Sequence, residues 1–288
     1  MGYTSYSVDN RSSRAAQLNY STATVDTIFE QQKLHSAHKD MLPKNVTFRE
    51  ARDSEAHPNV VPIVTGLDVT GSMGMIPENL VREGLPKLVS SIIEAGIPDP
   101  ALLFVAVGDH ECDNYPLQVA QFESGDAELD MWLTRTYIER GGGGNAGESY
   151  GLVWYFAANH TKTDAFQNRG KKGYIITVGD EPALKNYPKS ALKGLMGDSL
   201  NMEKNSYTRE ELLEQAQKMY NVFHISIEHG FRTVSKDWKE LLGPHLIVTH
   251  DYTEVPDLIA KIIIEEELKS FPQAKVEETS KKDTIEIL

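Results

Sequence analysis

From residue 60 onward, short continuous apolar runs alternate with longer stretches in which apolar residues recur every three or four positions. A continuous run is typical of a strand that is buried on both faces, whereas the second spacing is typical of the buried side of a helix. The runs predict strands over residues 60–67, 101–107, 174–178, 221–227 and 245–249, with a short edge strand over residues 117–122. This alternation predicts an α/β fold: a three-layer α/β/α arrangement with a mostly parallel central sheet and helices on both faces.

The helical spacing has its own start and stop signals. Pro86 lies inside the first helical stretch, so a bend or break is expected there. Thr208 and Glu211 have the spacing of a capping box, which predicts a helix that begins at this point and extends to about residue 220. The other predicted helices cover residues 80–95, 127–137, 148–159, 234–242 and 255–268.

Composition changes along the chain and suggests three regions. Residues 1–55 are rich in polar residues and poor in apolar ones, which predicts an arm that is partly disordered or wraps a partner. Within this arm, residues 25–38 have the pattern of a short helix. Residues 56–270 form the predicted α/β domain, and residues 271–288 form a charged C-terminal tail.

Charge and cysteine content narrow the possible partners and environment. The 288 residues carry a formal net charge of −13, which argues against nucleic acid and anionic membranes as main partners. The single Cys112 excludes an internal disulfide and is compatible with a reducing compartment. No apolar signal segment or membrane-spanning run is visible, so a cytoplasmic location is expected.

The candidate chemistry lies where the first predicted strand ends. Asp68 follows this strand, and the hydroxyls of Thr70 and Ser72 come two and four residues later. Carboxylate and hydroxyl oxygens are hard ligands that suit Mg²⁺. Asp109 and Asp180 also lie just beyond predicted strands. The carboxyl ends of parallel strands meet at one edge of the sheet, and ligands of such folds bind there. The three acids are therefore expected together at this edge.

The segment Asp68-Val69-Thr70-Gly71-Ser72 resembles the metal-ion-dependent adhesion site of von Willebrand factor A-type domains. The family pattern is Asp-x-Ser-x-Ser, and Thr70 supplies the same oxygen as the first serine. The resemblance extends from about residue 60 to residue 268, and it implies that Asp180 is the acid of the third ligand loop. The second loop corresponds to residues 141–148, where Gly144 stands at the position of the expected threonine.

This second loop is similar to a prokaryote-type branch of the family. In that branch a Gly-Gly-Gly-Asp-x-Pro-Glu-like loop recurs, together with an acid after the second strand. Here Asn145 stands where Asp is common, Gly147 stands where Pro is common, and Glu148 keeps the final acid. The resemblance therefore implies that Asp109, Asn145 and Glu148 lie behind the metal ligands and support them, with Asn145 or Glu148 able to contribute an oxygen.

The family resemblance implies a binding mechanism without turnover. The metal keeps an open coordination position, and an Asp or Glu of a partner protein completes it. Mg²⁺ is expected because few protein ligands and several waters suit the smaller ion, with Ca²⁺ and Mn²⁺ as alternatives. The implied partners include a MoxR-type AAA-plus ATPase, or a second copy of this chain on which the arm docks. The implied role is protein binding or scaffolding, and not an enzyme.

Three other motifs predict different functions. Residues 147–151 match the G-x-S-x-G pattern, which makes Ser149 the nucleophile of an alternative serine hydrolase, although no buried strand directly precedes it. An aspartyl-phosphate phosphatase would use Asp68, but Thr70 replaces its second acid. Residues 142–147 match G-x-G-x-x-G without the preceding strand that a dinucleotide site requires.

Overall fold

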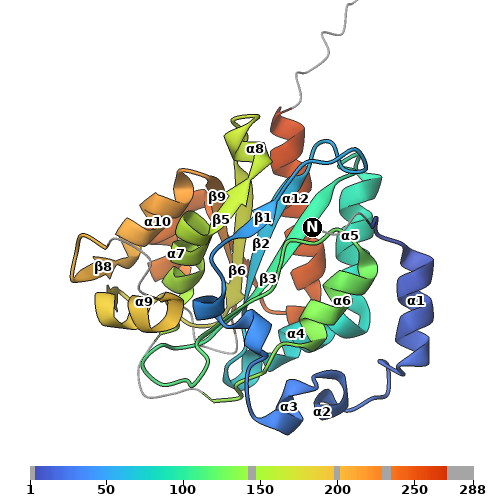
Figure 1. Cartoon of the computed structure of the whole chain (residues 1–288), viewed down its shortest axis with the longest axis horizontal. Helices are drawn as coiled ribbons and strands as arrows, with labels where there is room; N and C mark the ends of the chain where they lie inside the picture. The colour runs from blue at the N-terminus through green and yellow to red at the C-terminus, as the bar shows by residue number, and fades with distance from the viewer. Residues whose placement is uncertain (1–3, 142–146, 198–201, 229–234, 271–288) are drawn as a thin grey trace, which may run out of the picture.

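The computed structural model describes residues 4–141, 147–197, 202–228 and 235–270 (Figure 1). At its centre is a six-stranded sheet in the order β10-β9-β6-β2-β3-β4. All neighbouring strands are parallel except β4, which pairs antiparallel with β3. The strands are β2 (Val61–Asp68), β3 (Pro100–Val107), β4 (Leu117–Val119), β6 (Gly173–Gly179), β9 (Tyr220–Ile227) and β10 (Leu246–Thr249).

Helices cover both faces of this sheet, so the predicted three-layer α/β/α fold is confirmed (Figure 1). Successive side chains of a strand point to opposite faces. Ile63 and Leu67 of β2 accordingly join one apolar cluster, and Val64 joins the other. The first cluster includes residues of α5 (Leu85–Glu94), α6 (Asp126–Thr134) and α12 (Val255–Ser270). The second includes residues of α7 (Tyr150–His160), α9 (Lys189–Met196), α10 (Arg209–Gln217) and α11 (Ser235–Leu242).

Strand β2 lies between β3 and β6, and all its residues are buried. This position explains its continuous apolar sequence, because both faces pack against helices. Asp68 pairs in register with Val107, and Leu67 pairs with Val178. The carboxyl ends of three neighbouring strands therefore reach the same edge of the sheet, where Asp68 ends β2 and the other two predicted acids follow β3 and β6.

The first long helix is interrupted, as Pro86 predicted. It begins as α4 (Met75–Asn79), passes through a π-helical turn (Leu80–Gly84) and continues as α5. Pro86 has no N–H to donate to the preceding turn, which accounts for the irregular hydrogen bonding just before it. The helix starts earlier than expected, because the 3-10 turn after β2 (Gly71–Gly74) leads directly into it.

Four very short strands were not predicted. β1 (Arg49–Ala51) pairs with β5 (Thr161–Thr163), and β7 (Asn186–Pro188) pairs with β8 (Ser206–Thr208). Strands of three residues are too short for an alternating pattern to stand out. The capping box at the start of α10 is confirmed, since Thr208 and Glu211 exchange both of its hydrogen bonds.

The N-terminal arm packs its first helix on the outside of α5 and α6, and its residues 43–45 contact α9 on the other face of the sheet (Figure 1). It contains α1 (Val8–Gln17), α2 (Val25–Ile28) and α3 (Gln31–Leu34), so two short helices replace the single predicted one. Arg11 forms a buried ion pair with Asp130 of α6 at 3.1 Å. A further role of the arm in wrapping a partner stays a prediction. In the part of the chain that is described, no helix is long and apolar enough to cross a lipid bilayer.

Candidate metal centre

Asp68 lies at the carboxyl end of β2 and is completely buried. Its Oδ1 accepts hydrogen bonds from the backbone N–H of Thr70 at 2.8 Å and from the Thr70 hydroxyl at 2.7 Å. An aspartate commonly holds a turn in this way, by accepting from the backbone two residues ahead. Its Oδ2 accepts a hydrogen bond from the phenol of Tyr150 at 3.0 Å. The sequence spacing therefore does bring the first two predicted ligands together.

Glu148 approaches the same hydroxyl from a different loop. Its Oε1 lies 3.2 Å from Thr70 Oγ1. A hydroxyl has a single proton, so Thr70 cannot donate to Asp68 and Glu148 at once. Glu148 is only 5% exposed, and its buried Oε2 has no hydrogen-bond partner among the described residues. Two buried carboxyl groups thus meet at one hydroxyl, and one carboxyl oxygen is left free.

The electrostatic surroundings of these two acids are unfavourable for their charged forms. Burial raises the pKa of Asp68, and the nearby Asp180 raises it further, although hydrogen bonds from Thr70 and Tyr150 oppose the rise. Burial also raises the pKa of Glu148, with added repulsion from Asp68 and other acids. The charged groups that contribute most are all acids, so neither carboxylate gains from a neighbouring base.

Asp109 has a role in its own loop. It is 2% exposed, and its Oδ1 accepts a hydrogen bond from the backbone N–H of Glu111 at 2.9 Å. Its backbone N–H donates to Asp113 Oδ2 at 2.7 Å. The loop after β3 is therefore closed by its own acids, and Asp109 adds negative charge near Glu148. Asp109 thus organises the loop to which it belongs.

The structure describes the positions of some of the remaining predicted site residues. Asp180 directly follows β6 and lies close enough to Asp68 to raise its pKa. Ser72 lies in the 3-10 turn Gly71–Gly74, and Asn145 lies outside the described residues. Among the residues whose placement is described, no three His, Cys, Asp or Glu side chains form a metal-binding group by themselves. Hydroxyl oxygens would have to complete any ligand set here.

The oxygen donors present nevertheless suit a hard cation. Carboxylate and hydroxyl groups are the ligands that Mg²⁺ and Ca²⁺ take, and the described donors include no nitrogen or sulfur. The unpartnered Oε2 of Glu148 is the kind of buried polar atom that a native structure normally satisfies. A divalent cation beside it would supply both the missing contact and the missing positive charge.

Tyr150 was not predicted as a part of the site. It is the first residue of α7 and is fully buried, with its hydroxyl on Asp68. Gly179, the last residue of β6, leaves the space that this phenol fills. A side chain at position 179 would collide with the phenol and place its Cβ 2.8 Å from Asp68 Oδ2. The sequence indicated only a tyrosine near the start of a helix, which carries no signal of this contact.

The serine of the alternative hydrolase motif is in an unsuitable setting. Ser149 is fully buried, and its Oγ accepts from the backbone N–H of His110 at 2.9 Å and lies 2.7 Å from His110 Nδ1. Asp109 lies 3.9 Å from this same nitrogen, whereas a catalytic triad needs the acid on the opposite ring nitrogen. Ser149 instead joins the start of α7 to the loop after β3.

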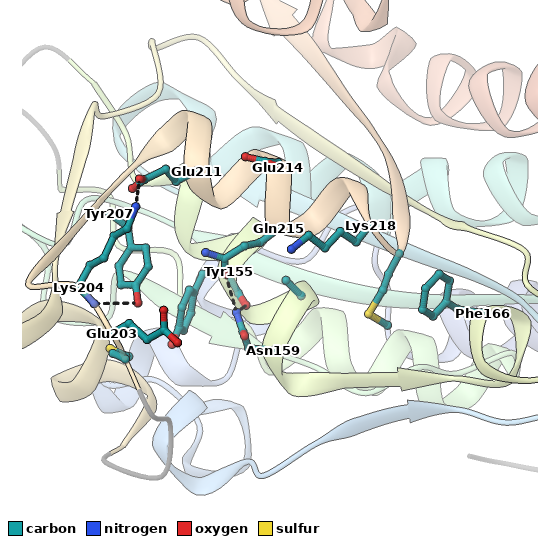
Figure 2. Close-up of a pocket in the computed structure, with 13 residues that line it drawn as sticks. Tyr155, Asn159, Phe166, Glu203, Lys204, Tyr207, Glu211, Glu214, Gln215 and Lys218 are labelled. Atoms are coloured by element: carbon teal, nitrogen blue, oxygen red, sulfur yellow. Dashed lines mark hydrogen bonds and ion pairs between the residues drawn. The ribbon is translucent and has the colours of Figure 1, made fainter.

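The structure also contains a cavity of about 690 Å³ away from these acids (Figure 2). Tyr155 and Asn159 line it from the later turns of α7, and Tyr207 lines it from β8. Part of its charge is already paired, since Lys204 contacts Glu211. No set of buried, unsatisfied donors or acceptors is found among its described lining residues, so the acids at the end of β2 remain the candidate site.

No model of a protein family matches this sequence, and no curated protein does. The fold resembles several solved structures. Proximal thread matrix protein 1 from the mussel byssus matches with 13% identity and a TM-score of 0.47, over 75% of this chain and 48% of that protein. The pilus adhesin SpaC from Lactobacillus rhamnosus GG matches with 13% identity and a TM-score of 0.45, over 75% of this chain and 31% of the adhesin.

A von Willebrand factor type A protein from Catenulispora acidiphila matches with 14% identity and a TM-score of 0.39, over 72% of this chain and 42% of that protein. The chain therefore spans less than half the length of each of these three proteins. The family that the sequence resembles is represented among the structures of similar fold. At these low identities the similarity concerns the fold alone.

Proposed function

We propose that this chain binds a divalent cation, Mg²⁺ in the first place, at the carboxyl end of β2, and that it binds a partner protein through this ion. The ligands are Asp68, Thr70, Ser72 and Asp180, directly or through water, with Glu148 beside them. One observation carries the proposal. Two buried carboxyl groups, on Asp68 and Glu148, lie at a single hydroxyl and have acids as their charged neighbours.

The free-energy cost of burying a charged carboxylate explains why this observation points to a cation. A buried carboxylate without a base or metal is strongly unfavourable, so the group either keeps its proton or finds a positive charge. Both acids have raised pKa values because they are buried and lie near other acids, so ionising them costs free energy. A bound divalent ion would let both groups ionise, and the two negative charges would then hold the ion in place.

The chemistry of the ligands favours binding over catalysis. When bound, the ion supplies a Lewis-acidic centre that attracts a further carboxylate. Thr70 and Ser72 are uncharged donors, so they leave the ion with positive charge to share with a partner's Asp or Glu. Ser149, the nucleophile of the alternative hydrolase, is fully buried. We therefore assign a protein-binding or scaffolding role without turnover.

The partner is proposed to be a protein that presents an acidic residue. A MoxR-type AAA-plus ATPase and a second copy of this chain are the two candidates, in a cytoplasmic setting. The net charge of −13 supports a partner other than nucleic acid. Since a metal bridge joins two acids that would otherwise repel, an acidic chain can still hold an acidic side chain of its partner.

Two measurements test this function. Calorimetric titration of the metal-free protein with MgCl₂ should give one site, and Asp68→Ala should abolish it. A pull-down with the purified chain as bait should then retain its partner in Mg²⁺ and lose it in EDTA, and Asp68→Ala should mimic EDTA. Binding that ignores both the chelator and the substitution rejects the metal bridge.

A further inference from the structure

The N-terminal arm touches the peptide segment that leads from α6 to the second ligand loop. Gln32, in α3 of the arm, donates from Nε2 to the carbonyl of Ile138 at 2.9 Å. Its Oε1 accepts from the backbone N–H of Ile138 at 3.2 Å. One side-chain amide thus makes both hydrogen bonds that a neighbouring strand would make. Gln32 is 7% exposed, so little water can replace these bonds.

The same segment touches the predicted metal loop on the other side. The backbone N–H of Arg140 donates to the carbonyl of Val69 at 3.3 Å, and the N–H of Gly71 donates to the carbonyl of Gly141 at 2.6 Å. These two bonds flank Thr70 on both sides. Further along, Ile138 packs so closely on Gly74 that a Cβ at Gly74 would lie 2.6 Å from Ile138 Cγ2.

The turn that receives these contacts needs outside support. Gly71 has a φ of +38°, a region that side-chain-bearing residues rarely adopt, and it stands between the two hydroxyl residues of the site. Its N–H points to Gly141 and has no helical partner there. The position of the Gly141 carbonyl therefore helps to set the direction in which the Thr70 side chain leaves the backbone.

The arm itself is anchored independently of this clamp. Arg82, in the π-helical turn, donates to the carbonyl of Ala23 at 2.7 Å and also to the carbonyl of Tyr20. Ile28 and Phe29 insert into the apolar cluster that also contains Val69. Gln32 thus lies in a well-packed part of the arm. It contacts residues 138–141, which on their other side contact the loop after β2.

We propose that Gln32 is a positioning residue of the metal centre: the arm, through its clamp on Ile138, holds residues 138–141 so that they fix the loop that carries Thr70 and Ser72. The inference rests on the proposed function, because it assigns the arm a part in metal binding. It makes the arm an internal support of the site.

The test compares two substitutions in the arm. Gln32→Met keeps the side-chain volume and removes both hydrogen bonds to Ile138. Arg14→Met removes an ion pair between the arm and Asp126 of α6, and it touches neither residues 138–141 nor the loop after β2. Both variants should unfold at lower temperature in EDTA. Only Gln32→Met should raise the Kd for Mg²⁺, by about tenfold, as loss of an outer supporting contact does at metal sites.

Amide hydrogen exchange of the metal-free protein gives a second readout. Gln32→Met should speed exchange at Gly71 and Ile138, whereas Arg14→Met should not. An unchanged Kd in Gln32→Met, or an equal loss of affinity in Arg14→Met, overturns the positioning role. If the wild-type chain binds no Mg²⁺, the proposed function fails, and the exchange data still decide whether Gln32 holds the loop.

Discussion

The phenol of Tyr150 donates a hydrogen bond to Oδ2 of Asp68 at 3.0 Å, although the two residues are 82 positions apart in the sequence. Tyr150 opens α7, and its ring packs edge-on against Trp238 and His224. The aromatic packing fixes the ring, and the ring fixes one oxygen of the acid. The orientation of the buried carboxylate is therefore determined from the second helical layer as well as from its own loop.

Replacing Tyr150 by Phe should loosen this carboxylate without leaving a large cavity. Loss of one buried hydrogen bond should lower the free energy of unfolding by about 1 kcal/mol. The Mg²⁺ affinity should fall by about tenfold, since Asp68 loses the contact that orients it. Titration calorimetry and thermal unfolding measure the two effects.

The matched control is Tyr155→Phe. Tyr155 lies on the same helix and is 3% exposed, and the described hydrogen bonds to Asp68 come from Thr70 and Tyr150. This variant should bind Mg²⁺ as the wild type does. Equal affinities in Tyr150→Phe and the wild type would show that the phenol does not orient a metal ligand.

Asp68→Asn should separate metal binding from stability. The amide oxygen can still accept from Thr70, and the amide nitrogen can donate to the Tyr150 oxygen, so the local fold should persist. Without metal, near pH 8, the variant should be more stable than the wild type by about 1–3 kcal/mol, because it removes a buried charge that no basic side chain among the described residues pairs with. It should gain nothing from Mg²⁺.

Chemical denaturation in EDTA and in MgCl₂ provides the measurement. Glu214→Gln, a similar change of acid to amide on an exposed position of α10, serves as the control and should behave as the wild type. A loss of stability in metal-free Asp68→Asn would contradict the idea that the ionised acid is costly in the absence of a cation.

Stability should depend on pH in a direction set by the raised pKa values of Asp68 and Glu148. In the unfolded chain both groups titrate near pH 4, so the folded protein holds more protons than the unfolded one above that pH. Their contribution to stability is present below about pH 4 and is lost as pH rises through the raised folded pKa values.

Mg²⁺ competes with these protons, so its stabilising effect should grow as pH rises from about 5 to about 8. Melting temperatures across this range, with EDTA or with MgCl₂, give the comparison. In Asp68→Asn the difference between the two conditions should vanish at every pH. A Mg²⁺ effect that is constant with pH in the wild type would mean that these acids do not release protons when the ion binds.

The sequence was sufficient to predict the sheet and the placement of Asp68. The continuous apolar run before it is what burial of β2 on both faces requires, and parallel strands bring their carboxyl ends to one edge. The contact of Asp68 with Thr70 also follows from local geometry, because the residues are only two apart. Structural features that follow from local or periodic sequence patterns could therefore be predicted.

Contacts between segments that are distant in the sequence could not be predicted in this way. Gln32 and Ile138 are 106 positions apart, and neither an arm glutamine nor an isoleucine indicates a clamp. Glu148 Oε1 lies 3.2 Å from Thr70 Oγ1, 78 positions earlier in the sequence, and a bridge to Ala183 fixes the Glu148 backbone beside the loop after β6. Such pairs depend on how loops meet after the sheet has formed, and a single sequence carries no record of that.

Gly179→Ala is expected to damage the site more than its size suggests. The new Cβ would collide with the phenol of Tyr150 and lie 2.8 Å from Asp68 Oδ2, both within the buried edge of the sheet. Overpacking of this kind costs about 1–3 kcal/mol of stability. Because the phenol must move away, Asp68 also loses its donor, and Mg²⁺ binding should weaken at least as much as in Tyr150→Phe.

Gly194→Ala isolates the effect of the collision. A Cβ at Gly194 meets no atom within 4 Å, and the residue lies inside α9, so alanine should raise the free energy of unfolding by about 0.5–1 kcal/mol. Both substitutions restrict the unfolded chain in the same way, so opposite signs can come only from the folded state. Equal stability and equal Mg²⁺ affinity in the two variants would mean that Tyr150 and Asp68 are not held against Gly179.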